Sequence, residues 1–156
     1  MVKLLLHTGL RVEEAVDLRW DDVQVRERSG SLTVRKGKGP KQRTVPLNAE
    51  ARAALLELKA AGPAGAPEVL HGQRGALTAR GVQAILQRYQ GPAKVEDLSP
   101  HVLRHTFGKD LADAGTPIQV IADLMGHESL ETTRRYVQPG HDDLAAAVEK
   151  LAGGDD

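Results

Sequence analysis

The spacing of apolar residues predicts a mostly helical protein with one small antiparallel sheet. Apolar side chains recur every three or four residues in several segments, as on the buried face of a helix. Between them, three short runs rich in β-type residues are separated by glycine-containing turns. The expected strands are Val23 to Arg26, Ser31 to Arg35, and Arg43 to Leu47.

Glycines, prolines and polar caps mark the ends of the expected helices. Gly9 should end the first helix, and Gly126 should end a later one. The helix after Asn48 should bury Ala51, Leu55 and Leu58. The helix after Thr78 should bury Val82, Ile85, Leu86 and Tyr89. The expected helices are Val2 to Leu6, Val12 to Leu18, Asn48 to Ala60, Thr78 to Gly91-Pro92, Ser99-Pro100 to Gly115, Thr116-Pro117 to Met125, Leu130 to Val137, and Asp142 to Leu151.

The length and composition favour a single soluble domain covering residues 1–156. A chain of 156 residues that is 40% hydrophobic can bury one core. No apolar run approaches the roughly 20 residues of a membrane span, and no signal-peptide pattern opens the chain. The sequence has no cysteine, which suits a reducing compartment. We therefore expect a cytoplasmic protein without a membrane partner.

The charges are balanced in number but uneven in position. There are 21 basic and 21 acidic side chains, yet the segment from Arg26 to Arg43 carries seven basic residues against the single acid Glu27. The segment from His141 onward is mainly acidic. A basic segment is often only a solvated face, so by itself this one permits nucleic acid without requiring it.

Five motifs, in order along the chain, resemble those of the tyrosine site-specific recombinases of the phage integrase family, and the chain looks Xer-like. They extend from about Thr8 to Val137. The motifs are Thr8-Gly9-Leu10-Arg11-Val12-Glu13-Glu14, Gly37-Lys38-Gly39-Pro40-Lys41-Gln42-Arg43-Thr44-Val45-Pro46-Leu47, His101-Val102-Leu103-Arg104-His105-Thr106, Leu124-Met125-Gly126-His127, and Thr132-Thr133-Arg134-Arg135-Tyr136.

The resemblance implies an α+β, mainly α, catalytic domain in which a sheet of about three strands packs on a helical core. It also implies a recombinase or integrase that cleaves and rejoins DNA through a 3′-phosphotyrosyl link, without metal or ATP. Members of this family usually carry an N-terminal DNA-clamping domain. Because Arg11 lies close to the start, we expect that this core-binding domain is absent, through excision or natural truncation, and that the chain alone recombines slowly or not at all.

The chemistry of DNA cleavage accounts for the arginines and histidines in these motifs. Attack on an anionic phosphodiester needs cations at the non-bridging oxygens, and the planar arginine fork suits them. Arg11 and Arg104 are the candidates. His101 lies three residues before Arg104 near the start of a predicted helix, so both should share one face close to free N–H groups.

Tyr136 is the expected nucleophile. A phenol has a pKa near about 10, so it needs a base or nearby positive charge, and His101 is our choice of base. Lys38, on the glycine-flanked turn, can protonate the leaving 5′ oxygen. It is better placed than Lys36, while Lys41 stays an alternative. His127 should bond the phosphate or orient Tyr136.

The expected partner is double-stranded DNA carrying a specific site. The resemblance implies a homo- or hetero-tetramer on DNA for the full-length protein, and we expect the chain alone to be a monomer. The segment from His141 to Leu151 should be an amphipathic helix that packs on its own domain or on a neighbouring subunit. Further, less certain DNA contacts are expected at Lys36, Lys41, Arg43, Arg134 and Arg135.

The same residues suggest three alternative functions. His101 and His105 have the spacing of a zinc-protease pair, but Val102 stands where the glutamate should follow, and Arg104 would repel a dication. A type IB topoisomerase uses a similar set of residues, although the histidine-containing motifs resemble recombinases. A catalytically impaired DNA-binding fragment should have lost at least one of the six candidate residues, and all six are present.

Overall fold

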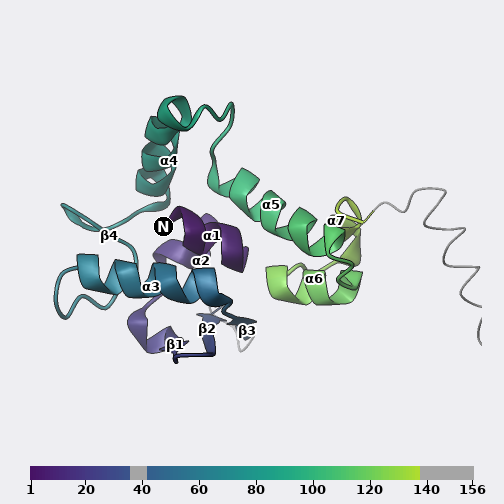
Figure 1. Cartoon of the computed structure of the whole chain (residues 1–156), viewed down its shortest axis with the longest axis horizontal. Helices are drawn as coiled ribbons and strands as arrows, with labels where there is room; N and C mark the ends of the chain where they lie inside the picture. Colours follow the sequence, from purple (N-terminus) through teal and green to yellow (C-terminus); the bar gives the residue numbers. More distant parts are fainter. Residues whose placement is uncertain (36–41, 138–156) are drawn as a thin grey trace, which may run out of the picture.

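The computed structural model describes residues 1–35 and 42–137. A small three-stranded sheet packs on a helical core, as the sequence predicts, and α5, α6 and α7 form the side of the molecule on the right of Figure 1. The predicted helix from Asp142 to Leu151 lies outside the described residues. The helices are α1 Val2–Thr8, α2 Val12–Val16, the 3-10 turn η1 Trp20–Asp22, α3 Ala49–Ala61, α4 Ala79–Ala93, α5 Pro100–Asp113, α6 Ile118–Met125 and α7 Leu130–Arg134.

The main sheet is antiparallel with the order β1-β2-β3. Its strands are β1 Val23–Val25, β2 Gly30–Arg35 and β3 Gln42–Pro46. Leu32 of β2 pairs with Val45 of β3, and both side chains are buried. The sheet therefore turns one apolar face toward the helices. Its register also places Arg43 opposite Val34, next to the Arg35–Gln42 pair that ends the β2–β3 ladder.

The core lies among α1, α2, α3, α4 and the sheet. It is almost entirely aliphatic, which fits the low aromatic content of 3%. Asn48 caps α3 by accepting a 2.9 Å bond from the N–H of Ala51, as predicted. The fully buried side chains at its centre include Leu4, Leu5, Leu10, Leu32, Leu55, Val82 and Leu86.

Helix α4 departs from the prediction at its C-terminal half. Tyr89 was expected on the buried face, but 56% of it is exposed, because the buried positions of this helix are confined to its first turns at Val82 and Leu86. The helix also continues through Pro92 to Ala93 and ends with Lys94 in the left-handed region. Pro92 has no N–H group, so the helix lacks the bond that this position would donate to the carbonyl four residues earlier.

Smaller differences concern helix ends and one extra hairpin. α2 ends at Val16 and α7 at Arg134, each shorter than predicted, whereas α6 covers Ile118–Met125 after the predicted Thr116-Pro117 start. A short β4–β5 hairpin, His71–Gly72 with Gly75–Ala76, was not predicted. Two-residue strands are too short to carry a periodic signal.

Candidate active site

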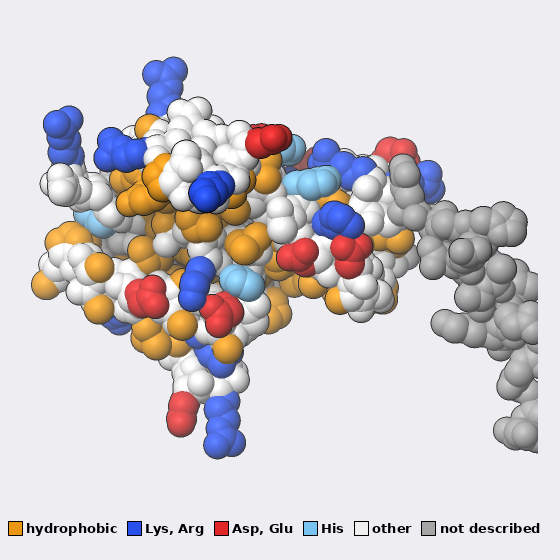
Figure 2. Space-filling view, turned by 45° about the horizontal axis from the view of Figure 1, so that its top comes forward, with side chains coloured by type: hydrophobic (Ala, Val, Ile, Leu, Met, Phe, Trp, Pro, Cys, Tyr) orange, Lys and Arg blue, Asp and Glu red, His pale blue; other side chains and the backbone are white. Residues whose placement is uncertain are grey.

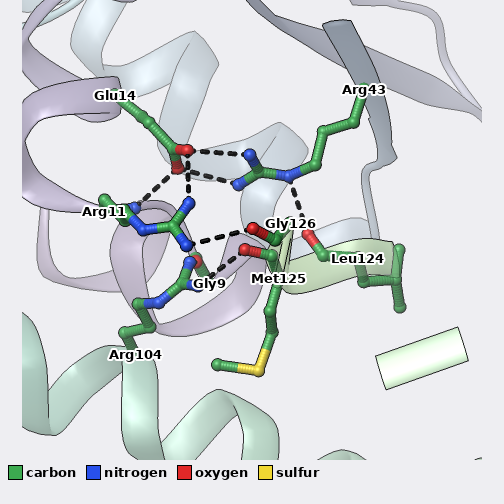
Figure 3. Close-up of polar contacts among 8 residues, drawn as sticks. All are labelled: Gly9, Arg11, Glu14, Arg43, Arg104, Leu124, Met125 and Gly126. Carbon is green, nitrogen blue, oxygen red and sulfur yellow. Dashed lines mark hydrogen bonds and ion pairs between the residues drawn. The ribbon is translucent and has the colours of Figure 1, made fainter. Parts of the chain in front are cut away.

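Three arginines from separate segments donate to the carbonyls of the last two residues of α6 and of its cap, Gly126 (Figure 3). The carbonyls at a helix C-terminus lack partners inside the helix and carry its negative partial charge. They therefore hold a cluster of guanidinium groups in one place. The bonds run from Arg43 Nε to the Leu124 carbonyl at 3.0 Å, from Arg104 Nη2 to the Met125 carbonyl at 2.6 Å, and from Arg11 Nη2 to the Gly126 carbonyl at 3.0 Å.

The carboxylate of Glu14 lies between two of these arginines. It accepts from the backbone N–H of Arg11 at 2.8 Å and from Arg11 Nη1 at 3.0 Å. Both terminal nitrogens of Arg43 also donate to it, each at 2.7 Å. Burial by itself would raise the pKa of Glu14, but these hydrogen bonds and charges outweigh it and lower the pKa to about 2. Glu14 is therefore ionised at neutral pH.

Arg104 is the most buried of the three arginines, with 8% of the residue exposed. Besides the Met125 carbonyl, it donates to the carbonyl of Gly9, which ends α1 in a left-handed conformation. Burial and then the charge of Arg11 lower the pKa of Arg104 to about 10. The side chain stays charged at neutral pH and is held by α1 and α6 together.

His127 follows α6 directly and is fixed by α7. Its Nδ1 lies 2.8 Å from the Oγ1 of Thr133, a fully buried residue. Burial, followed by the charges of the surrounding arginines, lowers the pKa of His127 to about 4. The ring is therefore neutral at pH 7, and one of its nitrogens can donate to a phosphate oxygen.

A pocket of about 350 Å³ brings four of the predicted site residues together. Arg11, His101, Arg104 and His127 line it, and Arg135 forms part of its wall. In the space-filling view, histidine, basic and acidic side chains gather over the α5–α7 side (Figure 2). Two guanidinium groups and two imidazoles around one cavity form an arrangement that can bind a phosphate.

Tyr136 lies beside this pocket and packs on α5. Its ring centroid is 5.0 Å from that of His105 and 6.4 Å from that of His127. The guanidinium carbon of Arg135 lies 5.3 Å from the Tyr136 centroid, within the range of a cation–π contact. A methyl group at Gly108 would come within 2.9 Å of the tyrosine ring. The absence of a side chain at Gly108 thus makes room for Tyr136.

The remaining predicted residues are not among the side chains that line this pocket or are not described. Lys36, Lys38 and Lys41 lie outside the described residues. Arg134 is 71% exposed and pairs with Glu131 at 3.1 Å. Arg43, a predicted DNA contact, has a side chain that is 15% exposed and pairs with Glu14.

No role was predicted for Glu14 or Thr133, and His105 was considered as part of a zinc-binding pair. For Glu14 a signal was present, because a glutamate three residues after a helix N-cap is half of a capping box. Thr133 and His105 meet the site only through tertiary contacts, which no local pattern predicts.

Metal-binding and membrane-spanning features are missing from the part of the chain that the structure describes. In residues 1–35 and 42–137, no group of three or more histidine, aspartate or glutamate side chains is placed to hold a metal ion. The pair His101 and His105 thus lacks a third ligand among these residues, as a zinc site would need. None of the helices described there is long and apolar enough to cross a membrane.

The fold is that of a tyrosine recombinase catalytic domain. XerH site-specific recombinase bound to difH substrate superposes with a TM-score of 0.80 and 26% identity, over 99% of this chain and 46% of that one. XerA recombinase gives a TM-score of 0.77 and 28% identity, over 96% and 54%. The chain belongs to the phage integrase family, whose model matches residues 1–142.

Curated relatives support the same assignment. Tyrosine recombinase XerA of Thermococcus kodakarensis is 38% identical over 154 residues, covering 96% of this chain and 54% of the relative. Tyrosine recombinase XerC of Leptospira interrogans serogroup Icterohaemorrhagiae serovar copenhageni is 37% identical over 157 residues, covering 96% and 49%. The chain thus spans about half the length of the curated relatives it matches.

Proposed function

We propose that this chain is the DNA-cleaving and rejoining part of a site-specific recombinase, with Tyr136 as nucleophile. The observation that carries the proposal is the pocket lined by Arg11, His101, Arg104 and His127, beside which Tyr136 lies. One DNA phosphate in this pocket would contact the two charged guanidinium groups of Arg11 and Arg104. It could also accept a hydrogen bond from the neutral imidazole of His127. The relatives are recombinases, so topoisomerase and purely DNA-binding functions are not favoured.

In the proposed reaction the Tyr136 oxygen attacks the phosphorus and the bond to the 5′ oxygen breaks. Arg11 and Arg104 stabilise the charge that develops on the non-bridging oxygens. His101 takes the phenolic proton, and Lys38 returns a proton to the leaving 5′ oxygen. The product is a 3′-phosphotyrosyl link and a free 5′-hydroxyl. Since one phosphodiester replaces another, the same site can reseal the strand.

For the whole protein we propose action on double-stranded DNA at a specific site, as part of a tetramer assembled there. Arg134, which is well exposed, and Arg135, at the wall of the pocket, are suitable for backbone contacts. Lys36 and Lys41 belong to the same proposal through the charge of their segment. A cytoplasmic location follows from this activity and is proposed with it.

The direct test is covalent trapping on DNA. The protein is incubated with a nicked suicide duplex that carries its recombination site, and products are separated on a denaturing gel. We expect a protein–DNA band that Tyr136→Phe abolishes. If DNA is bound but no band forms, even after fusion to the N-terminal DNA-clamping domain of a relative, the DNA-binding function would replace the enzymatic one.

A further inference from the structure

Arg43 and Glu14 meet in a two-pronged ion pair between β3 and α2. The distances from Nη1 to Oε1 and from Nη2 to Oε2 are both 2.7 Å, and the side chains are 15% and 12% exposed. Paired charge-assisted bonds of this kind are among the strongest in proteins and also fix orientation. The pair therefore joins the sheet to the helix that follows the pocket residue Arg11.

The rest of the Arg43 guanidinium is directed to the end of α6. Its Nε donates to the Leu124 carbonyl at 3.0 Å. The group also lies against Gly126, where an added Cβ would come within 2.6 Å of Nη1. Gly126 has φ 62°, so glycine suits this position for its backbone as well. Arg43 is thus enclosed by protein on the sides where its donors point.

Glu14, which is held in place by Arg43, in turn holds Arg11. The same carboxylate that holds Arg43 also accepts from the backbone and the Nη1 of Arg11, whose Nη2 donates to Gly126 (Figure 3). A carboxylate has about four acceptor sites, and four N–H groups occupy them here. The orientation of Arg11 toward the pocket is therefore determined by Glu14, and that of Glu14 by Arg43.

We infer that Glu14 and Arg43 form a positioning pair for Arg11, and that Arg43 acts on catalysis through Glu14 and not through DNA. This inference rests on the proposed function, because it concerns the arginine that would bind the scissile phosphate. A contact from Arg43 to DNA would require it to leave Glu14, whose carboxylate would then keep only its two bonds from Arg11. That exchange is unfavourable, since it gives up two charge-assisted hydrogen bonds in a largely buried place.

The pair also reduces the electrostatic repulsion among the three arginines. Arg11, Arg43 and Arg104 donate to three successive residues at the end of α6, so their like charges lie close together. Glu14 places a negative charge between Arg11 and Arg43. Without it, repulsion would turn Arg11 away from the phosphate.

Four variants test the inference: Arg43→Lys, Arg43→Gln, Glu14→Gln and the double variant Glu14→Gln/Arg43→Gln. Lys3→Gln is the matched control, because Lys3 also pairs with a glutamate at 3.0 Å but is 57% exposed and does not line the pocket. The rate of covalent-complex formation is measured on the suicide duplex. Circular dichroism at the assay temperature selects the variants that remain folded, and the neutral double variant avoids an unpaired charge.

Misplacement of a phosphate-binding group by about 1 Å can cost about 100-fold in rate. We expect each single change at Glu14 or Arg43 to slow cleavage by about that factor, Arg43→Lys included, because lysine keeps the charge but not the fork. The double variant should be slowed by about the same factor as each single variant, and not by the product of two such factors, because the two residues act as one unit. Lys3→Gln should match the wild type. Near-wild-type cleavage by Arg43→Lys, or multiplied losses in the double variant, would overturn the inference.

A second measurement separates this inference from the proposed function. In NMR spectra of the free protein, a held Arg11 side chain should give a sharp Nε–H signal that is lost in Arg43→Gln and kept in Lys3→Gln. An Arg11 signal unchanged by Arg43→Gln would overturn the positioning role. A wild-type chain that shows this dependence but forms no covalent complex would disprove the proposed activity, while the Arg43–Glu14–Arg11 coupling would stand.

Discussion

Replacement of Glu14 by glutamine should change the acid stability of the protein in a specific way. The pKa of Glu14 falls from an ordinary 4.5 to about 2 in the folded chain. A lowered pKa stabilises the fold above the unfolded value, and this contribution is lost as the pH falls from about 5 toward 2. The difference corresponds to about 3 kcal/mol at most, and solvent screening around the partly exposed Arg11 reduces it to about 2 kcal/mol.

The assay is urea unfolding of the wild type and Glu14→Gln at several pH values. At about pH 6 the variant should be less stable by about 2 kcal/mol, because it lacks the carboxylate between the two arginines. Toward pH 2 the two free energies of unfolding should converge, since protonated Glu14 and glutamine are both neutral. Glu50→Gln serves as the control: Glu50 also pairs with a cation, but at the surface, where pairs contribute little. A difference that stays constant with pH would refute the ion-pair account of Glu14.

Three further predictions concern neighbouring features. The NMR shifts of the His127 ring should stay constant from about pH 8 to pH 5.5, because burial and the nearby arginines lower its pKa to about 4; a transition near 6.5 would contradict this. Gly108→Ala should destabilise the fold by about 1 to 3 kcal/mol in urea, since its Cβ would lie 2.9 Å from the Tyr136 ring; unchanged stability would mean that the ring does not pack there. Asn48→Ala should cost about 1 kcal/mol through loss of the α3 cap, and a thermal melt equal to the wild type would argue against that bond.

Local signals in the sequence were sufficient for most of the secondary structure. The caps Asn48 and Ser99 and the terminating glycines Gly9 and Gly126 act within one helical turn, so they are readable without tertiary contacts. The exposure of Tyr89 could not be predicted from such local signals. Periodicity shows which face of a helix is apolar, but not how far along the helix its neighbours extend.

The identities of the candidate site residues likewise came from motifs, whereas their relationships did not. Arg11, His101, Arg104, His127 and Tyr136 were selected by type and order along the chain. The first four line one pocket and Tyr136 lies beside it, which by itself confirms none of the chemical roles. This arrangement supplies the geometry that the proposed roles require.

The sequence alone determined the family, the mainly helical fold with its small sheet, and the residues capable of phosphate chemistry, because each depends on local patterns or motif order. Only the tertiary structure decided that Arg43 faces inward and that Glu14 joins it to Arg11. It also decided that three arginines converge on the end of α6. These contacts join residues up to 115 positions apart. Their partners are chosen by packing and by the carbonyls left free at a helix end, which no segment of the sequence specifies without the others.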